Sequence, residues 1–529
     1  MTKCQNFSLT EMCETQLGSG NTRREIDNEV ALKTWAQSRE GLMNYLSHCE
    51  TDTYFIAAIA IKLQMLPLTK VLTNLAGNSW ARTLSGTRAE RNEYILLHEF
   101  HKHKYICPDK IFGKSRGRGP EDEDADEAGE GKKRSKFTGG LVFEPERGLY
   151  DKFVLVMDFN SLYPSIIQEF NICFTTVDRP ASSNTSSGLE DDKVPELPVE
   201  QAQGILPRLI ATLVNRRRAV KSLMKDPRTT PAEHTTYDIK QLALKLTANS
   251  MYGCLGYTKS RFYARPLAML TTYKGREILL STRELAESHQ LQVIYGDTDS
   301  VMINTNADNL ADARKIGNDF KRAVNERYKL LEIDIDNFFR RLLLHAKKKY
   351  AAINMVQVDG KYVDVLEVKG LDMKRREYCA LSKEISGKLL NEILSGEESE
   401  LVVTRVHEHL REVAEKMREG AIPVQKYIIY TKLGKHPKDY PNADSMPQVQ
   451  VALRAMAAGK TVRVNDVMSY IITTSTTTPN ASEPAAKRAY APQDVMKADS
   501  GLIPGMCVPD CPWQPPSARH RIDMSTDEI

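Results

Sequence analysis

Two aspartates, Asp297 and Asp299, are the residues whose type and spacing most directly predict chemistry. They lie within Leu291–Asn304, between two short arms of β-branched and apolar side chains, and this pattern predicts a hairpin that turns at Gly296-Asp297. On an extended backbone both side chains would point the same way, and two carboxylates that close repel each other unless a cation lies between them. Carboxylate oxygens are hard ligands that favour Mg²⁺. An ordinary polar turn accounts for the same residues, and a third carboxylate elsewhere in the chain would favour the metal site.

Asp158 is the third carboxylate that such a site needs. It follows Phe153–Met157, a continuous apolar run with the length of a buried strand, and it precedes Pro164, which suits the first turn of a helix. The end of a buried strand is a good position for a catalytic side chain, although a lone aspartate there also serves as a helix cap. Asp158, Asp297 and Asp299 together predict a carboxylate site at the ends of two strands.

An antiparallel helix pair is predicted for Ile205–Lys225 and Ala232–Leu255, which a turn rich in Pro and Thr separates. The two helices gather cations on faces without acidic partners, which costs electrostatic repulsion unless an anion such as a triphosphate lies there. A solvated basic face explains the same spacing, but an aromatic ring beside it offers a surface on which a base stacks. The residues that share a face are Arg217 and Lys221 on the first helix and Lys245, Asn249 and Tyr252 on the second.

A further basic feature follows the carboxylate hairpin along the chain. Lys347, Lys348 and Lys349 end an apolar strand and are followed by Tyr350, which makes a local positive point suited to the phosphates of a nucleic acid. A solvated strand end is the alternative explanation. A second basic segment strengthens the nucleic-acid interpretation, and its candidate residues are Lys369, Arg375 and Arg376.

The composition limits the class of protein. A chain of 529 residues exceeds a single hydrophobic core, and its net charge of +4 is small, so any basic signal must be local. The nine cysteines are scattered and odd in number, which predicts reduced thiols in an intracellular protein rather than a disulfide framework. No run of eighteen apolar residues occurs, so we expect no membrane partner. Cys507 and Cys511 have no second pair with which to complete a zinc site.

Charge and periodicity divide the rest of the chain. Residues 113–136 carry an acidic block followed by basic residues, and residues 178–203 are rich in Ser, Pro and acids, so both segments are expected to be loops. The tail 501–529 lacks periodicity and receives no predicted fold. Elsewhere the pattern predicts helices at 31–46, 54–66, 71–97, 382–394 and 398–418, and strands at 449–451 and 468–472.

Four motifs, in this order, resemble those of B-family DNA polymerases. They are Asp158–Ser165 (DFNSLYPS), Lys245–Gly253 (KLTANSMYG), Tyr295–Ser300 (YGDTDS) and Lys347–Tyr350 (KKKY). The likeness is strongest to the eukaryotic branch of that family that works with a primase, and it runs from about residue 50 to about residue 500. The resemblance implies a DNA-directed DNA polymerase of the nucleus, acting in the initiation of replication.

The resemblance also implies a role for each candidate residue. Asp158 and Asp299 would bridge two Mg²⁺ ions, with Asp297 assisting and the backbone of Phe159 as a further metal ligand. Tyr163 would fill the space of a ribose 2′-hydroxyl and so select deoxynucleotides. Contacts to the dNTP would come from Ser161, Leu162, Tyr163, Arg217, Lys221, Lys245, Asn249 and Tyr252. Contacts to primer-template DNA would come from Lys347, Lys348, Lys349, Tyr350, Lys369, Arg375 and Arg376.

The implied fold is α+β, with the right-hand polymerase architecture of an antiparallel-sheet palm, two-helix fingers and a partial, mostly helical thumb. His48–Asp52 lies where proofreading relatives have a Tyr-x3-Asp element, and we expect no 3′–5′ exonuclease because we expect no Asp-x-Glu element before it. The expected divisions are a remnant of the N-terminal and exonuclease-like region at 1–110, an acidic and basic disordered loop at 111–140, palm at 141–203 and 257–365, fingers at 204–256, an incomplete thumb at 366–500 and an atypical tail at 501–529.

Departures from the family pattern leave alternatives open. Most of the exonuclease-like domain and the C-terminal cysteine-rich modules are missing, so we expect the docking site for accessory subunits to be absent. Primer-template or RNA-primed DNA, dNTPs and, by resemblance, primase are the other expected partners. A catalytically weak or inactive nucleic-acid-binding fragment is one alternative. A two-metal nuclease is another, although phosphate-binding helices and a gate tyrosine would be of no use to a nuclease.

Overall fold

A computed structural model describes residues 8–18, 20, 23, 33–35, 37–109, 139–178, 194–198, 202–358, 360–371, 378–473, 486–497 and 502–504. Arg375, Arg376 and nearly all of the segments 111–140 and 501–529 lie outside these residues. The chain divides into two compact units, which are described separately. The first comprises Met1–Gly117, Gly129–Leu371 and Leu394–Gly396, and the second comprises Arg118–Ala128, Asp372–Ile393 and Glu397–Ile529.

The first unit is built around an antiparallel sheet with the strand order β3-β4-β2-β5-β6-β7, to which β1 adds by pairing with β5. Strand β2 lies inside the sheet because its run of apolar residues suits burial on both faces, and Val154, Leu155 and Met157 are each 0% exposed. The strands are β1 Gly148–Tyr150, β2 Val154–Phe159, β3 Gln292–Asp297, β4 Ser300–Asn304, β5 Ile333–Ala346, β6 Lys349–Val358 and β7 Lys361–Lys369.

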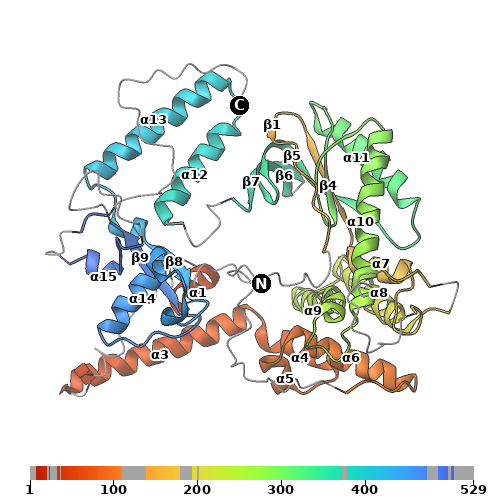
Figure 1. Ribbon diagram of the computed structural model, residues 1–529, viewed down its shortest axis with the longest axis horizontal. Coiled ribbons are helices and arrows are strands. Elements are labelled where there is room, and N and C mark those ends of the chain that lie inside the picture. The colour runs from red at the N-terminus through yellow and green to blue at the C-terminus, as the bar shows by residue number, and fades with distance from the viewer. Residues whose placement is uncertain are drawn as a thin grey trace. The chain divides into compact units, whose positions relative to one another are not determined.

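Helices α10 (Arg265–Ser288) and α11 (Leu310–Asn325) contact the sheet, α10 on β3 and β4 and α11 on β2 and β5 (Figure 1). The side chains between them form the main hydrophobic core, in which Leu155 of β2, Leu285 of α10 and Phe320 of α11 are buried. Helix α10 is absent from the sequence prediction, although Pro266 occupies its first turn. The mixture of helices with an antiparallel sheet confirms the expected α+β class.

The predicted antiparallel helix pair is confirmed as α8 (Ile205–Met224) and α9 (Pro231–Gly256). The turn between them starts α9 with a capping box, in which the Thr230 side chain accepts from the Glu233 backbone N–H and the Glu233 side chain accepts from the Thr230 backbone N–H. Helix α7 (Leu162–Glu169) begins directly after β2, as Pro164 predicts, and contacts α8, α9 and α10. The chain from β2 to α9 therefore forms one connected support for the candidate site.

The segment before residue 110 is helical. Its helices are α1 Leu9–Leu17, α3 Arg39–Lys62, α4 Met65–Ala76, α5 Trp80–Ser85 and α6 Arg88–Lys102. The prediction of separate helices at 31–46 and 54–66 is wrong, because α3 continues to Lys62 and the chain then turns at Gln64, whose φ is 50°. No single helix in the described part of the chain has the length and apolar composition of a membrane span, although α3 and α4, which meet at a bend of 50°, satisfy those criteria as a pair.

The second unit combines helices with a small antiparallel sheet of order β10-β9-β8. Helices α12 (Ala380–Ile393) and α13 (Ser399–Arg418) confirm the prediction for this region. The strand predicted at Val449-Gln450-Val451 is wrong, because these residues lie in a helix that Pro447 starts. The remaining elements are β8 Ile429–Lys432, α14 Pro447–Ala457, β9 Val467–Ile472, β10 Ala489–Tyr490 and α15 Pro492–Val495.

Candidate active site

The pairing of β2 with β4 brings Asp158 and Asp299 to the same end of the sheet. Asp158 lies opposite Ser300, and the N–H of Phe159 donates to the carbonyl of Asp299 at 2.8 Å. The hairpin itself is confirmed, but its turn lies at Thr298-Asp299 rather than at Gly296-Asp297. Thr298 adopts a φ of 60°, and the N–H of Asp299 donates to the carbonyl of Asp297 at 2.6 Å. The two hairpin aspartates are therefore separated by a left-handed residue and not by a straight strand.

Burial and like charge raise the pKa of both carboxyls of the pair. Burial, then Asp299 and then Asp336 raise the pKa of Asp158 to about 7. Burial also raises the pKa of Asp299, with a further contribution from Asp297. Burial and nearby negative charge both oppose ionisation of these carboxyls. A divalent cation bound between them would favour their ionised forms, so the pair suits such a cation. Among the described residues, however, no group of three His, Cys, Asp or Glu side chains is arranged to hold a metal ion.

Asp297 has a cationic partner within the protein. The ammonium group of Lys348 donates to Asp297 Oδ1 at 2.7 Å and to Oδ2 at 2.8 Å. The hydroxyl of Tyr295 accepts the backbone N–H of Lys348 at 2.9 Å and donates to Asp297 Oδ2 at 3.4 Å. Burial raises the pKa of Tyr295 to about 12, so its hydroxyl remains a donor at neutral pH. The structure thus places Asp297 beside Lys348, and its role in metal binding stays a prediction.

A pocket of about 210 Å³ lies between α7, α8 and α9. Of the predicted nucleotide-binding residues, its lining includes Ser161, Arg217, Lys221, Lys245 and Asn249. Ser161 precedes α7 with a φ of 53° and makes no side-chain cap, so the first turn of α7, which begins at Leu162, is not capped by a side chain. Uncapped amides at a helix start favour an anion.

The charge of this pocket is largely uncompensated. Arg217 is half-buried, its pKa is lowered by burial, and its Nε donates to the neutral amide of Gln241 at 3.4 Å. Within the part of the chain that the structure describes, neither Lys221 nor Lys245 forms an ion pair. Among the described lining residues the one acid is Glu332, which lies 3.4 Å from Arg218. An anion with several negative charges is the complementary ligand.

Tyr163 and Tyr252 stack on each other beside the carboxylate pair. Their ring centroids are 4.4 Å apart and the ring planes differ by 24°. Burial raises the pKa of both phenols, and for Tyr163 the charge of Asp299 adds to the effect. A Cβ added to Gly275 would lie 3.3 Å from the ring of Tyr163, so this glycine allows the close approach of α10. The predicted gate and base-packing residues are therefore neighbours.

Lys347 to Tyr350 form the turn between β5 and β6 and the start of β6. Lys347 pairs with Glu144 at 2.5 Å, and Lys369 on the neighbouring strand pairs with Glu367 at 3.1 Å. These lysines keep 44% and 58% of their side chains exposed, as is typical of groups that can exchange partners. Tyr350 faces inward instead, because its ring packs near Phe339 and burial raises its pKa. Lys349 starts β6, while Arg375 and Arg376 lie outside the described residues.

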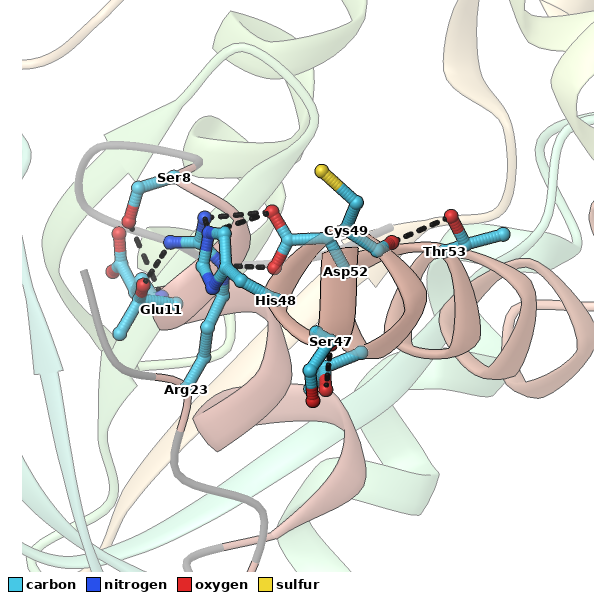
Figure 2. Close-up of polar contacts among 10 residues, drawn as sticks. Ser8, Glu11, Arg23, Ser47, His48, Cys49, Asp52 and Thr53 are labelled. Carbon is cyan, nitrogen blue, oxygen red and sulfur yellow. Dashed lines mark hydrogen bonds and ion pairs between the residues drawn. The ribbon is translucent and has the colours of Figure 1, made fainter. Parts of the chain in front are cut away.

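The aspartate of the exonuclease-like element is held by an arginine. Figure 2 shows Arg23 with its guanidinium on Asp52 of α3, at 2.6 Å through Nε and 2.8 Å through Nη2. This hydrogen bonding lowers the pKa of Asp52, and His48 lies 3.5 Å from the same carboxylate. An Asp-x-Glu spacing does occur earlier, at Asp27 and Glu29, which lie outside the described residues. The expectation of no exonuclease therefore stays a prediction.

Three neighbours of the site were missed in the sequence. Asp336 affects the pKa of Asp158 from β5, and the alternation Asp334-Ile335-Asp336 on a strand was the signal for it. Arg218 lines the pocket next to Arg217. Arg276 partly offsets the raised pKa of Tyr163 and of Tyr252. Nothing in the sequence marks this residue, because it lies on α10, the helix that was not predicted.

The comparisons with known proteins agree with this geometry. Residues 78–502 match the family model for DNA polymerase family B. The chain is 52% identical over 510 residues to a DNA polymerase alpha catalytic subunit of Saccharomyces cerevisiae, covering 95% of this chain and 34% of that protein. It is 46% identical over 506 residues to the DNA polymerase alpha catalytic subunit of Xenopus laevis, covering 94% and 34%. The chain thus spans about a third of the length of the curated relatives that it matches.

A solved structure gives the same result for the fold. The family B DNA polymerase from the hyperthermophilic archaeon Pyrobaculum calidifontis superposes with a TM-score of 0.61 at 26% identity, covering 94% of this chain and 59% of that one. A family match over most of the chain and high identity to several relatives point to the same group. The chain belongs to DNA polymerase family B.

Proposed function

We propose that this chain catalyses template-directed DNA synthesis, adding deoxynucleotides to the 3′ end of a primer. The observation that carries the proposal is the juxtaposition of the Asp158–Asp299 pair, the stacked Tyr163 and Tyr252, and the basic pocket between α7, α8 and α9. A nucleotidyl transfer needs an anionic metal site, a surface for the nucleoside and a cationic site for the triphosphate. Relatives named as catalytic subunits of DNA polymerase alpha support the same activity.

The architecture that goes with this proposal is a right hand. The sheet with α10 and α11 would be the palm, α8 and α9 the fingers, and the second unit a partial thumb. The proposed divisions are those expected from the sequence, with palm at 141–203 and 257–365, fingers at 204–256 and thumb at 366–500. The second unit contains a small three-stranded sheet, but most of its described helical and strand residues are in helices, so a thumb of this kind would be mostly helical.

The residues of the site would divide the work of the reaction. Asp158 and Asp299, with the backbone of Phe159, would hold two Mg²⁺ ions, and Asp297 would assist them. Bound there, such ions stabilise the charge on the attacking and leaving oxygens of an in-line displacement. The primer 3′-oxygen would form a bond to the α-phosphorus as the bond to pyrophosphate breaks. Arg217, Lys221, Lys245, Asn249 and the amides of Ser161 and Leu162 would bind the triphosphate, so that positioning and charge supply the catalysis.

Sugar selection and base packing are assigned to the tyrosine pair. Tyr163 would lie beneath the sugar and exclude a 2′-hydroxyl by occupying its space. Tyr252 would pack against the nascent base pair. Its ring stacks on that of Tyr163 with centroids 4.4 Å apart, so the residues assigned to the sugar and to the base are neighbours. Lys347, Lys348, Lys349, Tyr350 and Lys369 would grip the primer-template, together with Arg375 and Arg376.

The biological setting follows from the relatives alone. We infer a nuclear role in the initiation of DNA replication, in which primase would supply an RNA-primed template. Accessory subunits would be further partners, because these relatives are named as subunits. These partners are proposed for this chain because several of its relatives are named as catalytic subunits of the alpha polymerase.

Primer extension by the recombinant chain tests the proposal. A labelled primer-template, four dNTPs and Mg²⁺ should give products that extend one nucleotide at a time and copy the template. A folded chain, shown so by circular dichroism, that binds the duplex without incorporating dNTPs would identify an inactive nucleic-acid-binding fragment instead. Degradation of the DNA in the absence of dNTPs would indicate the nuclease.

A further inference from the structure

Helix α6 contacts the C-terminal half of α9 through polar side chains that are almost fully buried. Asn92 is 1% exposed, and its amide donates hydrogen bonds to Ser250 Oγ at 2.9 Å and to Cys254 Sγ at 3.2 Å. Glu93 is 6% exposed and accepts a hydrogen bond from Arg261 Nε at 3.1 Å, just beyond the end of α9. Buried polar groups are costly unless they are paired, so these contacts favour one arrangement of the two helices.

The contacted residues alternate along α9 with those of the candidate site. Ser250 and Cys254 are one turn apart and point toward α6, whereas Asn249 lines the basic pocket and Tyr252 stacks on Tyr163. Each residue of a helix is rotated by about 100° from the last, so a small rotation of α9 about its axis moves both faces together. Two hydrogen bonds from one amide to residues a turn apart resist that rotation.

Cys254, which accepts from that amide, also resists sliding of α9 along α6. Cys254 donates to the carbonyl of Ala89 at the start of α6, and its own pKa is raised by burial to about 11, so the thiol stays protonated and keeps this bond. Arg261 is tied to two points, Glu93 and the carbonyl of Pro108 at 2.9 Å. Both ends of the contact therefore join the helical segment before residue 110 to the helix that carries Asn249 and Tyr252.

We propose that Asn92 is a positioning residue that sets the rotation of α9 and so places Asn249 and Tyr252 for nucleotide binding, with Glu93 holding the end of the helix through Arg261. The inference rests on the proposed polymerase function. It gives the segment before residue 110 a part in nucleotide selection. A merely structural amide would affect the free energy of unfolding and leave the kinetic constants alone.

The first test compares steady-state incorporation by the full chain and by Asn92→Leu, which keeps the size of the side chain and removes both hydrogen bonds. The KM for the incoming dNTP is expected to rise about fivefold, the effect of losing one net hydrogen bond, with kcat changed less than about twofold. Discrimination against ribonucleotides should fall as well, because Tyr252 supports Tyr163. An unchanged KM in a folded Asn92→Leu chain would overturn the proposal.

Two further variants separate positioning from stability. Thr83→Val removes the hydrogen bonds of another buried side chain, to Asn78 and Thr73, and does not touch the polar contact with α9. It is expected to lower Tm by a similar amount and leave KM unchanged. Asn92→Leu combined with Ser250→Ala should be no worse in KM than Asn92→Leu alone. A Thr83→Val chain with the same rise in KM, or full additivity in the double variant, would contradict a specific role for Asn92.

Hydrogen exchange provides a readout that does not depend on activity. In Asn92→Leu the amides of the last two turns of α9 should exchange faster than in the wild type, with α8 unchanged. Failure of the wild-type chain to incorporate dNTPs would overturn the proposed polymerase function. The exchange experiment would then decide the helix contact separately, and unchanged exchange in α9 would overturn it.

Discussion

The Asp158–Asp299 pair is the proposed centre of the reaction. Asp158 comes from β2 and Asp299 from the turn before β4, and the pKa of both is raised by burial and by nearby negative charge, which is the cost that a divalent cation offsets. Asp297 differs from them because Lys348 already balances its charge. Among the described residues, Asp297 forms an ion pair with Lys348 and Asp158 and Asp299 form none, so the two kinds of carboxylate lead to different predictions.

Replacement of either member of the pair should stop the reaction without releasing the DNA. Asp158→Asn or Asp299→Asn is expected to lower the rate of incorporation by about 10³-fold or more, because several kcal/mol of charge stabilisation depend on the bound ions. Primer-template affinity, measured by fluorescence anisotropy, should change little. Asp319→Asn on α11 is a matched control, because that carboxylate is 60% exposed in its side chain. Equal loss of binding and incorporation would contradict a metal role for the pair.

The raised pKa of Asp158 predicts a pH dependence of stability in the presence of a chelator. The folded chain favours the protonated form up to about pH 7, compared with an ordinary value of 3.8. The stabilising contribution of the protonated carboxyl is therefore complete below the lower value and is lost as the pH rises through the higher one. Asp158→Asn should exceed the wild type in Tm by about 2 °C above pH 7, and the difference should shrink toward pH 4. A constant difference across this range would argue against the shift.

Tyr163→Ala should relax the choice of sugar. Removing the ring opens the space that a 2′-hydroxyl needs, so discrimination between dNTPs and ribonucleotides is expected to fall at least about tenfold while DNA synthesis continues. Single-nucleotide incorporation with each sugar measures the ratio. Tyr257→Ala at the end of α9, an exposed tyrosine, serves as the control. Loss of activity without a change in the ratio would show that Tyr163 is not the gate.

At the scale of elements, two turns are joined next to the carboxylates. Asp297 ends β3 next to its turn into β4, the turn between β5 and β6 carries Lys348, and Tyr295 bonds to both residues. Gly370 completes the arrangement, because a Cβ at that position would lie within van der Waals overlap of the carbonyl of Lys348. A substitution in the turn that carries Lys348 is therefore expected to alter the position and charge balance of Asp297.

Lys348→Ala tests that connection. Loss of the ammonium group leaves Asp297 uncompensated beside Asp299, so the site becomes more anionic and incorporation should require less Mg²⁺, while primer-template should bind more weakly. The slope of log Kd against log salt concentration should fall by about one if Lys348 contacts a phosphate. In the double variant Lys348→Ala with Asp297→Asn, the Mg²⁺ requirement should return most of the way to that of the wild type, while the salt dependence of Kd should stay reduced. Lys361→Ala, at the exposed start of β7, should change neither property.

Much at this scale could be predicted from the sequence, because it depends on local pattern. The apolar run before Asp158 and the Pro164 after it define a strand and a helix start, and both are confirmed. The three residues at 449–451 mislead because so short an alternation is also compatible with a helix, and Pro447 decides the matter. The ion pair between Asp297 and Lys348 joins residues 51 positions apart, and no local signal predicts such a contact.

At the scale of the whole molecule, the chain consists of two units that each have a core of their own. The first has the large core around the sheet, and the second has smaller clusters, one of which contains Leu433, Val449 and Ala452, all 0% exposed. Units with separate cores can differ in stability. The predicted nucleotide-binding residues belong to the first unit, so a destabilising substitution in the second unit is expected to leave nucleotide affinity unchanged.

Leu433→Ala should reveal this division in a calorimetric experiment. The substitution leaves a cavity in the second unit and is expected to cost about 2–5 kcal/mol of its stability. One of two thermal transitions should then move to lower temperature while the other stays in place. Retention of the dNTP KM, with weaker binding of primer-template, would fit a thumb. An equal shift of both transitions would show that the units unfold together.

The pairing of β2 with β4 has a consequence for how such a chain can change over evolutionary time. Hydrogen bonds between β2 and β4 hold Asp158 beside Asp299, while helices α7 to α10, which come between β2 and β3 in the sequence, lie outside the sheet. Insertions, deletions or exchanges of helices within that segment need not alter the spacing of the two carboxylates. The reacting centre can thus be inherited unchanged while the substrate-facing helices diverge.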